Sequence, residues 1–574
     1  MLSTRTLLAV AFSLASPSLA RAAEPAALLP PDAFLVAELP RGGKTVDALL
    51  ASRAWRALLA SDANAAFRSG PDFLRLTAGI AMLEASCGTD LASAARALLG
   101  KETAVALVPQ GSGAGLVAVA AIDDAVAAES VLSGLEALAS ASGKGALAPP
   151  AAHARGEIRA VAPNLFRART ATHVVVGSTA DLVRAALDRE GGAGARRPEW
   201  MPAAPEGAAA YDLEIAYRPA AAPKKIPERL ADLGQALLFG GFAEALRGAD
   251  VATASFDVDA SGAGPAIVVR VPGVAAGAFF PETSAGSRRD LPHPPRSLGA
   301  IRIRRDLASL WDVRETLLDA KAISGLAQFA GFMAILFSGK DFGEDVLPKF
   351  LPDVEIVAAR AEFAPGEPKP KVPVPAFGAI FRLRDAAGFG PFLEVAFQTA
   401  LGVVNADRGQ KGMMPMLIRT ETHRGASVVS GRFVASSSGD PEDAQWNYSP
   451  AAAIAGDRFI LASSAAFCRD LVDDATVSIP LSQGGSGAVQ DQVVVDGGSV
   501  HAYLAGIEEA MVAQNRLEKG NDEAAARREV SALLSLVRLV ERLEIVTRVD
   551  GTGLRADAWL SLVPPAAERK AGAR

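Results

Sequence analysis

Gly42-Gly43-Lys44-Thr45 is the pattern in this chain that comes nearest to a phosphate-binding loop. It follows a strand-like run and precedes a helix-like one, which is where such a loop lies in nucleotide-binding proteins. The full motif also requires glycine at position 38, so that backbone amides can surround the phosphates. Glu38 stands there instead, and its carboxylate would repel them. The pattern therefore does not predict nucleotide binding.

Hydroxyl side chains occur at two predicted strand-to-helix junctions, where some hydrolases present a nucleophilic serine. Neither junction has the G-x-S-x-G pattern, and no histidine is expected at matching positions in the two halves of the chain. A hydroxyl or carboxylate just before a helix accepts hydrogen bonds from free amides of the first turn, so helix capping is the preferred interpretation. The residues expected to cap helices in this way are Ser178, Thr179, Ser463, Ser464, Asp124 and Asp385.

Histidine and cysteine spacing does not indicate a metal site. No H-x-x-x-H or H-E-x-x-H pattern occurs, and no histidine has a cysteine nearby; a site assembled from scattered ligands is the alternative. Cys87 and Cys468 are expected to be buried as small apolar residues, with a disulfide between them as the alternative in an oxidising compartment. We thus predict no catalytic, cofactor-binding or metal-binding residues. The histidines are His153, His173, His293, His423 and His501, of which the second and last are expected to be partly buried.

Composition excludes two classes of protein. Half of the 574 residues are apolar and 21% are charged, which is unlike a disordered chain. The 58 Lys and Arg residues against 64 Asp and Glu residues give a net charge of −6. A broadly basic nucleic-acid-binding protein is therefore excluded, and no nucleic-acid partner is expected.

The N-terminus has the pattern of a secretory signal peptide. Arg5 precedes the apolar run Leu7–Leu14, and small residues follow, with cleavage expected after Ala20 or Ala22. The mature protein is therefore expected in the periplasm or outside the cell. No later segment reaches the about 18 apolar residues of a membrane span. Gly325–Phe337 comes closest and is predicted to be a buried helix, so the exported chain is expected to be soluble.

The same order of helices and strands is predicted twice along the chain, which indicates a duplication. Each copy opens with a tryptophan on a leucine-rich helix stripe, Trp55 or Trp311, and each is expected to be a buried core anchor. Alternating polarity, as in Glu544–Val549, is typical of an antiparallel sheet with one solvated face. The predicted fold class is therefore α+β, with two duplicated units, each a mostly antiparallel sheet with helices packed on one face.

The stretch 281–297 is rich in proline and serine, which favours an extended linker between the units. The predicted domains are a signal peptide at 1–22, a first α+β unit at 23–280, the linker at 281–297, a second α+β unit at 298–565 and a disordered tail at 566–574.

Leu29–Leu39 (LPPDAFLVAEL) resembles the first strand of a family of exported bacterial proteins known only as a family of unknown function. The similarity continues through Leu98–Pro109 (LLGKETAVALVP) and Leu116–Leu138 and ends with His173–Asp188 (HVVVGSTADLVRAALD). It is fainter in the second half, so the family domain would be present as two divergent tandem units. The resemblance implies an extracytoplasmic domain without an assigned activity, and it lends no site residues.

In the absence of a catalytic pattern, the expected function is that of an exported, non-enzymatic protein that binds or carries an apolar ligand. A sheet covered by helices can open an apolar pocket between the two layers. The expected partner is an apolar small molecule or lipid, and no cofactor is expected. One alternative is an interaction or structural protein of the cell envelope, with an envelope protein as partner. The second alternative is an uncharacterised hydrolase.

Overall fold

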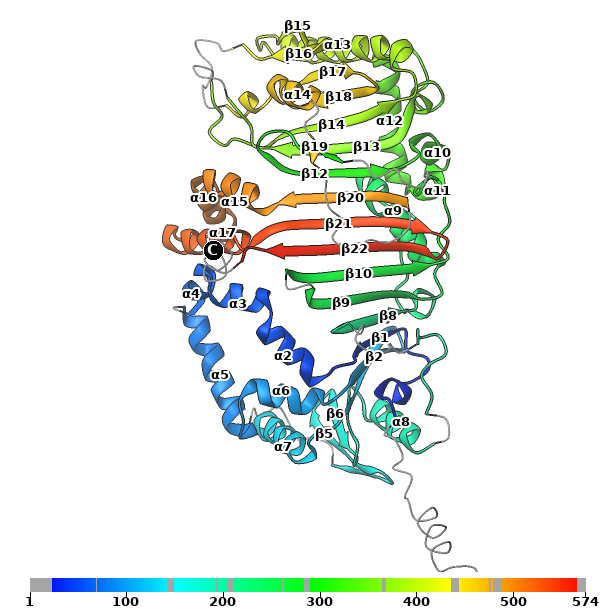
Figure 1. Cartoon of the computed structure of the whole chain (residues 1–574), viewed down its shortest axis with the longest axis vertical. Helices are drawn as coiled ribbons and strands as arrows, with labels where there is room; N and C mark the ends of the chain where they lie inside the picture. Colours follow the sequence, from blue (N-terminus) through cyan, green and yellow to red (C-terminus); the bar gives the residue numbers. More distant parts are fainter. Residues whose placement is uncertain are drawn as a thin grey trace, which may run out of the picture. The chain divides into compact units, whose positions relative to one another are not determined.

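The structure is a computed structural model, and its elements are shown in Figure 1. The predicted signal peptide, the tail at 566–574 and residues 283–289 of the predicted linker lie outside the residues that it describes. The described residues are 23–68, 70–141, 149–192, 195–203, 211–260, 263–282, 290–363, 368–434, 443–473, 476–477 and 488–564.

The chain packs into two compact units. Unit 1 comprises Met1–Asp47 and Arg75–Pro223, and unit 2 comprises Ala48–Leu74 and Lys224–Arg574. These units do not coincide with the predicted segments 23–280 and 298–565. The difference arises because the hairpin at 252–272, which the sequence analysis placed in the first unit, pairs with the last strand of the chain and so belongs to unit 2.

The sheet of unit 1 is antiparallel, and its strands are hydrogen-bonded in the order β8–β1–β2–β3–β7–β6–β5–β4. Helix α8 packs on the face that carries Val117 and Val175, and α7 packs against Val174 on the opposite face. The strands are β1 (Leu35–Leu39), β2 (Thr103–Gln110), β3 (Gly113–Ala121), β4 (Ala151–His153), β5 (Gly156–Ala162), β6 (Leu165–Arg169), β7 (His173–Gly177) and β8 (Leu213–Tyr217). The helices are η1 (Pro25–Leu28), α6 (Leu91–Leu99), α7 (Ala125–Ala141), α8 (Ala180–Gly191) and η3 (Pro219–Ala221), while α2 (Gly43–Ala51) and α5 (Pro71–Cys87) each have residues in both units.

The main sheet of unit 2 is also antiparallel, in the order β9–β10–β22–β21–β20–β12–β13–β14–β18–β17–β16–β15. A short pair, β11 with β19, stands apart from it. The strands are β9 (Ala252–Ala260), β10 (Gly264–Pro272), β11 (Leu291–Pro292), β12 (Ser297–Arg304), β13 (Phe350–Ala359), β14 (Ala376–Leu383), β15 (Leu417–His423), β16 (Ala426–Arg432), β17 (Ala451–Ala455), β18 (Arg458–Ala462), β19 (Thr476–Val477), β20 (Ala488–Asp496), β21 (Val540–Asp550) and β22 (Gly553–Leu562).

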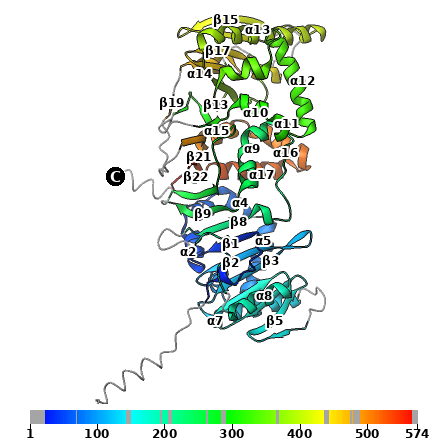
Figure 2. The same cartoon turned by 90° about the vertical axis from the view of Figure 1, so that its right-hand side faces the viewer.

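Helices α9 to α12 gather on one side of the unit 2 sheet (Figure 2). The α+β class and the largely antiparallel sheets are confirmed. The prediction that the helices pack on one face of each sheet is wrong for unit 1, where α7 and α8 lie on opposite faces. The helices of unit 2 are α3 (Arg53–Leu59), α4 (Asp62–Arg68), α9 (Leu233–Gly248), α10 (Leu307–Asp312), α11 (Arg314–Leu317), α12 (Ala320–Leu336), η4 (Phe342–Val346), η5 (Leu347–Lys349), α13 (Ala386–Gln410), η6 (Ala444–Asn447), α14 (Ala465–Val472), α15 (Gly497–Gly506), α16 (Glu508–Lys519) and α17 (Glu523–Val537).

The strand order of unit 1 recurs within unit 2. In unit 1 the strands lie side by side in the order β8–β1–β2–β3–β7–β6–β5–β4, and in unit 2 eight strands lie in the order β20–β12–β13–β14–β18–β17–β16–β15. The two orders are the same when the strands of each set are numbered from first to last along the chain. A common order of strands does not by itself establish common descent, and duplication stays a prediction.

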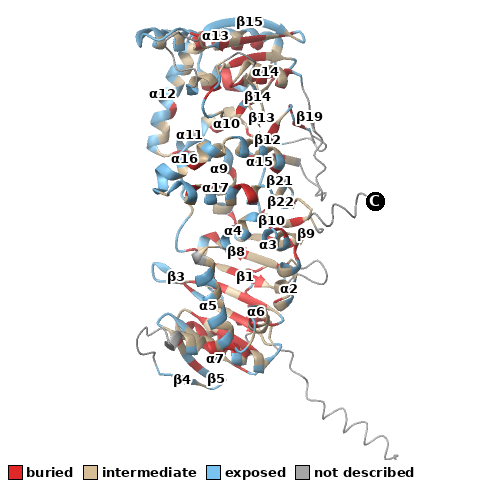
Figure 3. Ribbon diagram, turned by 90° about the vertical axis from the view of Figure 1, so that its left-hand side faces the viewer, coloured by how far each residue is buried: buried red, intermediate tan, exposed pale blue. Residues whose placement is uncertain are grey.

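The apolar helix α12 is not buried, which contradicts the prediction for Gly325–Phe337. Within α12 only Leu326 is buried, whereas Phe329, Phe332 and Ile335 are exposed; Figure 3 shows the helix mostly in tan and pale blue. The helix packs one narrow stripe against α13 and η4 and leaves the rest of its apolar surface uncovered by described residues. By length and composition α13 could cross a membrane, although the sequence analysis found no such segment.

Neither tryptophan expected to anchor a core is fully buried. Trp55 and Trp311 are both partly buried, and Trp311 packs against the buried residues Leu318 and Leu326. Full burial of the two indoles is therefore wrong, whereas their role as core anchors stays a prediction. The indole of Trp311 also forms part of a cavity wall.

Candidate ligand cavity

Three aspartates fix where the helices around the cavity begin. The carboxylates of Asp232, Asp306 and Asp319 each accept a hydrogen bond from the amide three residues later, which caps α9, α10 and α12. Such caps satisfy amides that have no partner inside the helix. The apolar sides of these helices then face one another and β14 across a space that their side chains do not fill.

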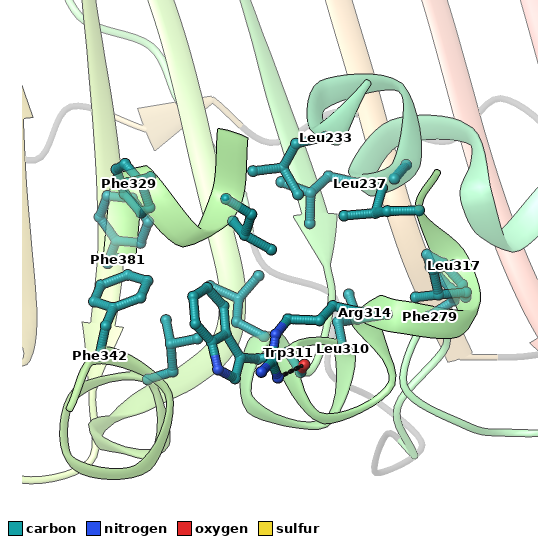
Figure 4. A pocket seen from close by; sticks show the side chains of 15 residues that line it. Leu233, Leu237, Phe279, Leu310, Trp311, Arg314, Leu317, Phe329, Phe342 and Phe381 are labelled. Atoms are coloured by element: carbon teal, nitrogen blue, oxygen red, sulfur yellow. Dashed lines mark hydrogen bonds between the residues drawn. The ribbon is translucent and has the colours of Figure 1, made fainter. Parts of the chain in front are cut away.

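That space is an apolar cavity of about 290 Å³ inside unit 2 (Figure 4). Leucines of α9 lie on one side of it, and phenylalanines of α12, η4 and β14 lie on another. Among the described residues that line it, Arg314 is the only charged one. The lining residues are Leu233, Ala236, Leu237, Phe279, Leu307, Leu310, Trp311, Arg314, Leu317, Leu318, Leu326, Phe329, Phe342, Leu347 and Phe381.

Edge-to-face contacts between aromatic rings position the side chains that form one wall of the cavity. The ring of Phe342 lies 5.4 Å from the ring of Trp311 and 5.4 Å from that of Phe329, at steep interplanar angles. A Cβ atom at Gly343 would stand 2.2 Å from Trp311 Nε1, so the indole requires glycine beneath it. The position of Trp311 is therefore set by its neighbours without any ligand.

Arg314 lies across the indole at the edge of the cavity. Its guanidinium is 4.8 Å from the Trp311 ring centroid, and Nη1 donates a hydrogen bond of 2.6 Å to the Trp311 carbonyl. Within the part of the chain that the structure describes, no carboxylate forms an ion pair with it. Its partners among the described residues are therefore a ring face and a carbonyl oxygen.

A polar groove adjoins the cavity. Phe279, Leu310 and Leu317 line both the cavity and this groove, whose volume is about 1080 Å³. The groove also contains charged residues, among them Arg229 and Glu244. An occupant of the cavity could therefore have an apolar part inside and a polar part outside.

Unit 1 contains a second apolar cavity, of about 400 Å³, between its sheet and helices α6 and α7. Leu132 of α7 is one of its lining residues, and Arg167 is the charged one among the described residues. Here the charge is already paired: Arg167 Nε lies 2.5 Å from a carboxylate oxygen of Glu136, and Nη2 lies 3.3 Å from Glu129. The two cavities therefore differ in whether their arginine has an acidic partner.

Three glutamates of unit 1 form the only cluster, among described residues, with the spacing of a metal site. Ligand oxygens of Glu24, Glu38 and Glu102 lie within 4.8 Å of one another. Burial, together with the charges of Glu24 and Glu38, raises the pKa of Glu102 to about 7. Arg197 donates to both Glu24 and Glu38. Because this arginine already occupies the oxygens that a cation would need, the cluster gives no support for a metal site.

The helix caps predicted from the sequence are confirmed at four of the six residues. Each accepts a hydrogen bond from an amide in the first turn of the following helix. The pairs are Asp124 with Ala127 N, Thr179 with Leu182 N, Asp385 with Gly388 N and Ser464 with Phe467 N.

Ser178 and Ser463 do something else, so the capping prediction is wrong for them. The hydroxyl of Ser178 accepts from the amide of Leu116 at 3.0 Å, and that of Ser463 accepts from the amide of Phe377 at 3.0 Å. Their own amides donate back to the same two residues. Each serine thus adds one more pair of hydrogen bonds between two neighbouring strands, and its hydroxyl oxygen is the acceptor in one of them.

Histidine–aspartate pairs occur at matching places, which contradicts the expectation that none would. His153 ends β4 and its Nε2 lies 2.9 Å from Asp188 of α8. His423 ends β15, the corresponding strand, and its Nε2 lies 2.7 Å from Asp473, just after α14. The first pair joins the end of β4 to α8, and the second joins the end of β15 to the C-terminal end of α14.

His173 is fully buried and has a structural role. Its Nδ1 lies 2.7 Å from Glu190 and its Nε2 lies 2.9 Å from the carbonyl oxygen of Ala23. Although burial opposes it, hydrogen bonds from His173, Thr172 and Thr170 hold the pKa of Glu190 at about 2. Of the other predicted positions, His501 is partly buried, as expected, and His293 is exposed.

The remaining motifs from the sequence analysis are a glycine-rich loop and two cysteines, and both have structural explanations. The amide of Gly43, in the loop that resembles a phosphate site, donates to the carbonyl oxygen of Gly100 at 2.6 Å. Cys87 and Cys468 are buried, as predicted, and both are free thiols. Burial raises the pKa of Cys468 to about 12, which keeps it in the unreactive thiol form.

Comparison with known proteins identified no similar protein. No family model, no curated protein and no solved structure matches the chain. The resemblance to exported bacterial proteins therefore stays a prediction.

Proposed function

We propose that this protein binds or carries an apolar ligand, without catalysis, in the cavity between α9, α10 and α12. The observation that carries the proposal is the lining itself: about 290 Å³ surrounded almost entirely by leucine and aromatic side chains. An apolar cavity of about 150 Å³ with a similar lining can take up benzene, so a cavity of this size has room for a larger hydrocarbon group. The described residues that line it include no nucleophile and no carboxylate or imidazole.

Filling the cavity tests this function. Leu326 lines the cavity and is buried, and Leu326→Trp would place an indole where the ligand should lie. We expect binding of the neutral dye Nile red at this site to weaken by at least about tenfold, because the dye would lose apolar contact area. The measurement is a fluorescence titration, supported by solvent extraction and mass spectrometry of any copurified compound.

Two further variants make the result specific. Leu517→Trp makes the same change at a side chain that is 81% exposed on α16, and should leave binding unchanged. Leu132→Trp fills the cavity of unit 1 and should remove only dye bound there. Equal dye binding in Leu326→Trp and Leu517→Trp would rule out this cavity as the site.

The second candidate function is an interaction protein of the cell envelope. The specific observation in its favour is the uncovered apolar surface of α12, where Phe329, Phe332 and Ile335 are exposed. This alternative needs no ligand. It would be preferred if purified protein neither bound the dye nor released an extracted compound.

We also propose that the protein is exported, on the pattern of Arg5, Leu7–Leu14 and Ala20–Ala22. N-terminal sequencing of the protein purified from its native cells is expected to give a chain that begins at Arg21 or Ala23. A mature protein that still begins at Met1 would contradict export by this route.

Descent by duplication is a further part of the proposal. The matching strand orders support it, and so do two repeated local contacts. In one, a serine at a strand end exchanges hydrogen bonds with the neighbouring strand, at Ser178 and Ser463. In the other, the histidines at 153 and 423 pair with aspartates behind them. A structural superposition should also bring Asp124 onto Asp385; their falling on different elements would count against duplication.

A further inference from the structure

We infer that the ligand of the unit 2 cavity is an amphiphile whose single anionic head group binds Arg314. This inference rests on the proposed function and adds the chemical class of the ligand. The chain of the amphiphile would occupy the apolar interior, and its head would lie at the cavity edge.

The first argument is the state of Arg314. A guanidinium has five N–H donors, and the described residues give this one a single hydrogen-bond acceptor, the carbonyl oxygen of Trp311. The guanidinium carbon lies 4.8 Å from the centroid of the Trp311 ring, and the donors other than Nη1 have no acceptor among the described residues. A planar fork of donors held in this way matches a carboxylate or phosphate group.

The second argument is the contrast with unit 1. Arg167 is 4% exposed and is neutralised by Glu129 and Glu136, so that cavity offers no free positive charge to a ligand. Arg314 lines a cavity of similar character and has no such partner among described residues. Selection for an anion is therefore expected in unit 2 and not in unit 1.

The third argument concerns polarity around the cavity. A wholly apolar ligand would need no cation at its edge, and a small anion would gain nothing from the leucine and phenylalanine lining. One ligand uses both features when it combines a hydrocarbon chain with a charged head. Arg314 is itself partly exposed, so a head bound to it would have access to water.

The test compares ligands with one chain and different heads. Dodecanoate, dodecyl phosphate and dodecanol are titrated as competitors of Nile red at the site that Leu326→Trp removes. The wild-type protein should prefer one or both anions over the alcohol by at least about tenfold, the effect expected of a hydrogen bond to a charged group. Which anion binds better identifies a carboxylate or a phosphate head.

Arg314→Gln should abolish this preference and leave the affinity for dodecanol within about twofold, while Arg314→Lys should keep part of the preference. A purely structural role of Arg314, as a cap of α10, would lower thermal stability without changing the ratio of the affinities. Arg229→Gln, in the groove, is the matched control and should keep the full preference. If the glutamine variant unfolds, the lysine variant and the wild-type comparison at raised salt take its place.

The outcomes separate the two claims. Dye binding that Leu326→Trp removes, combined with equal affinity for acid and alcohol, would overturn the head-group inference and keep the proposed function. A preference that survives Arg314→Gln but is lost in Arg229→Gln would place the head in the groove and also overturn the inference. Absence of dye binding would refute the proposed function itself.

Discussion

Replacing Asp491 by alanine is expected to lower the free energy of unfolding of unit 2 by about 3–5 kcal/mol, the usual cost of removing one partner of a buried ion pair. Arg305 is fully buried, and its Nη1 and Nη2 lie 2.7 and 3.1 Å from the two carboxylate oxygens of Asp491. Without the aspartate, this guanidinium would keep its charge with carbonyl oxygens and the ring of Phe280 as its described neighbours.

The pair matters for the cavity as well as for stability. Arg305 also donates to the carbonyl oxygens of Leu237 and Phe279, two residues of the cavity lining. Asp491 belongs to β20, so the arginine joins the cavity wall to the sheet. Burial raises the pKa of Asp491, although the charge of Arg305 opposes this rise. The carboxylate therefore depends on the arginine to remain charged inside the protein.

Denaturant unfolding followed by tryptophan fluorescence gives the measurement, because four of the five tryptophans belong to unit 2 and only Trp200 belongs to unit 1. Glu509→Ala, which breaks the exposed pair with Arg527, is the control and should change stability little. Arg305→Met combined with Asp491→Leu should recover much of the loss, since replacing both charges leaves neither unpaired. A single variant no less stable than the control would contradict the prediction.

Gly100→Ala is expected to destabilise unit 1 by about 1–3 kcal/mol from backbone strain alone, with a steric clash in addition. Gly100 follows α6 with φ of 58°, a conformation that other residues rarely adopt. A Cβ atom there would stand 1.8 Å from the carbonyl oxygen of Ala121. That oxygen accepts a hydrogen bond from the amide of Lys101, so moving away would break the pairing that begins the β2–β3 hairpin.

Gly79→Ala is the matched control for this change. Gly79 lies within α5, and nothing stands within 4 Å of where its Cβ would be. The same substitution should therefore stabilise the protein by about 0.5–1 kcal/mol, since alanine favours a helix more than glycine does. Hydrogen exchange of peptides from β2 and β3, read by mass spectrometry, distinguishes the two results. Equal protection in both variants would show that the position after α6 tolerates a side chain.

The sequence predicted those features of the fold that depend on neighbouring residues. Helix caps such as Thr179 and Asp385 were found because a cap and its amide lie three residues apart. The fold class followed from alternating polarity in strands such as Glu544–Val549. Burial of α12 was predicted wrongly, because its composition gives no information on how many elements pack around it.

The sequence predicted the type of site, an apolar pocket, but not the residues that line it. An apolar pocket between sheet and helices follows from the layers, but its walls come from α9, α10, α12 and β14, which are far apart along the chain. The pairing of Arg305 with Asp491 joins residues 186 positions apart, and no local pattern marks it. The place of Arg314 in the cavity lining was not predicted, because the sequence analysis interpreted the residue that it contacts, Trp311, as a core anchor.

The pairing of β10 with β22 means that the predicted linker does not separate two independent pieces. Residues Ala266–Pro272 are hydrogen-bonded to Gly553–Trp559. A strand that precedes 281–297 in the sequence and a strand that follows it are therefore neighbours in the sheet of unit 2. A cut there would leave each fragment with a long row of unpaired backbone donors and acceptors along a strand edge, the arrangement that recruits another strand. The two fragments would then be complementary partners, each holding the edge that the other lacks.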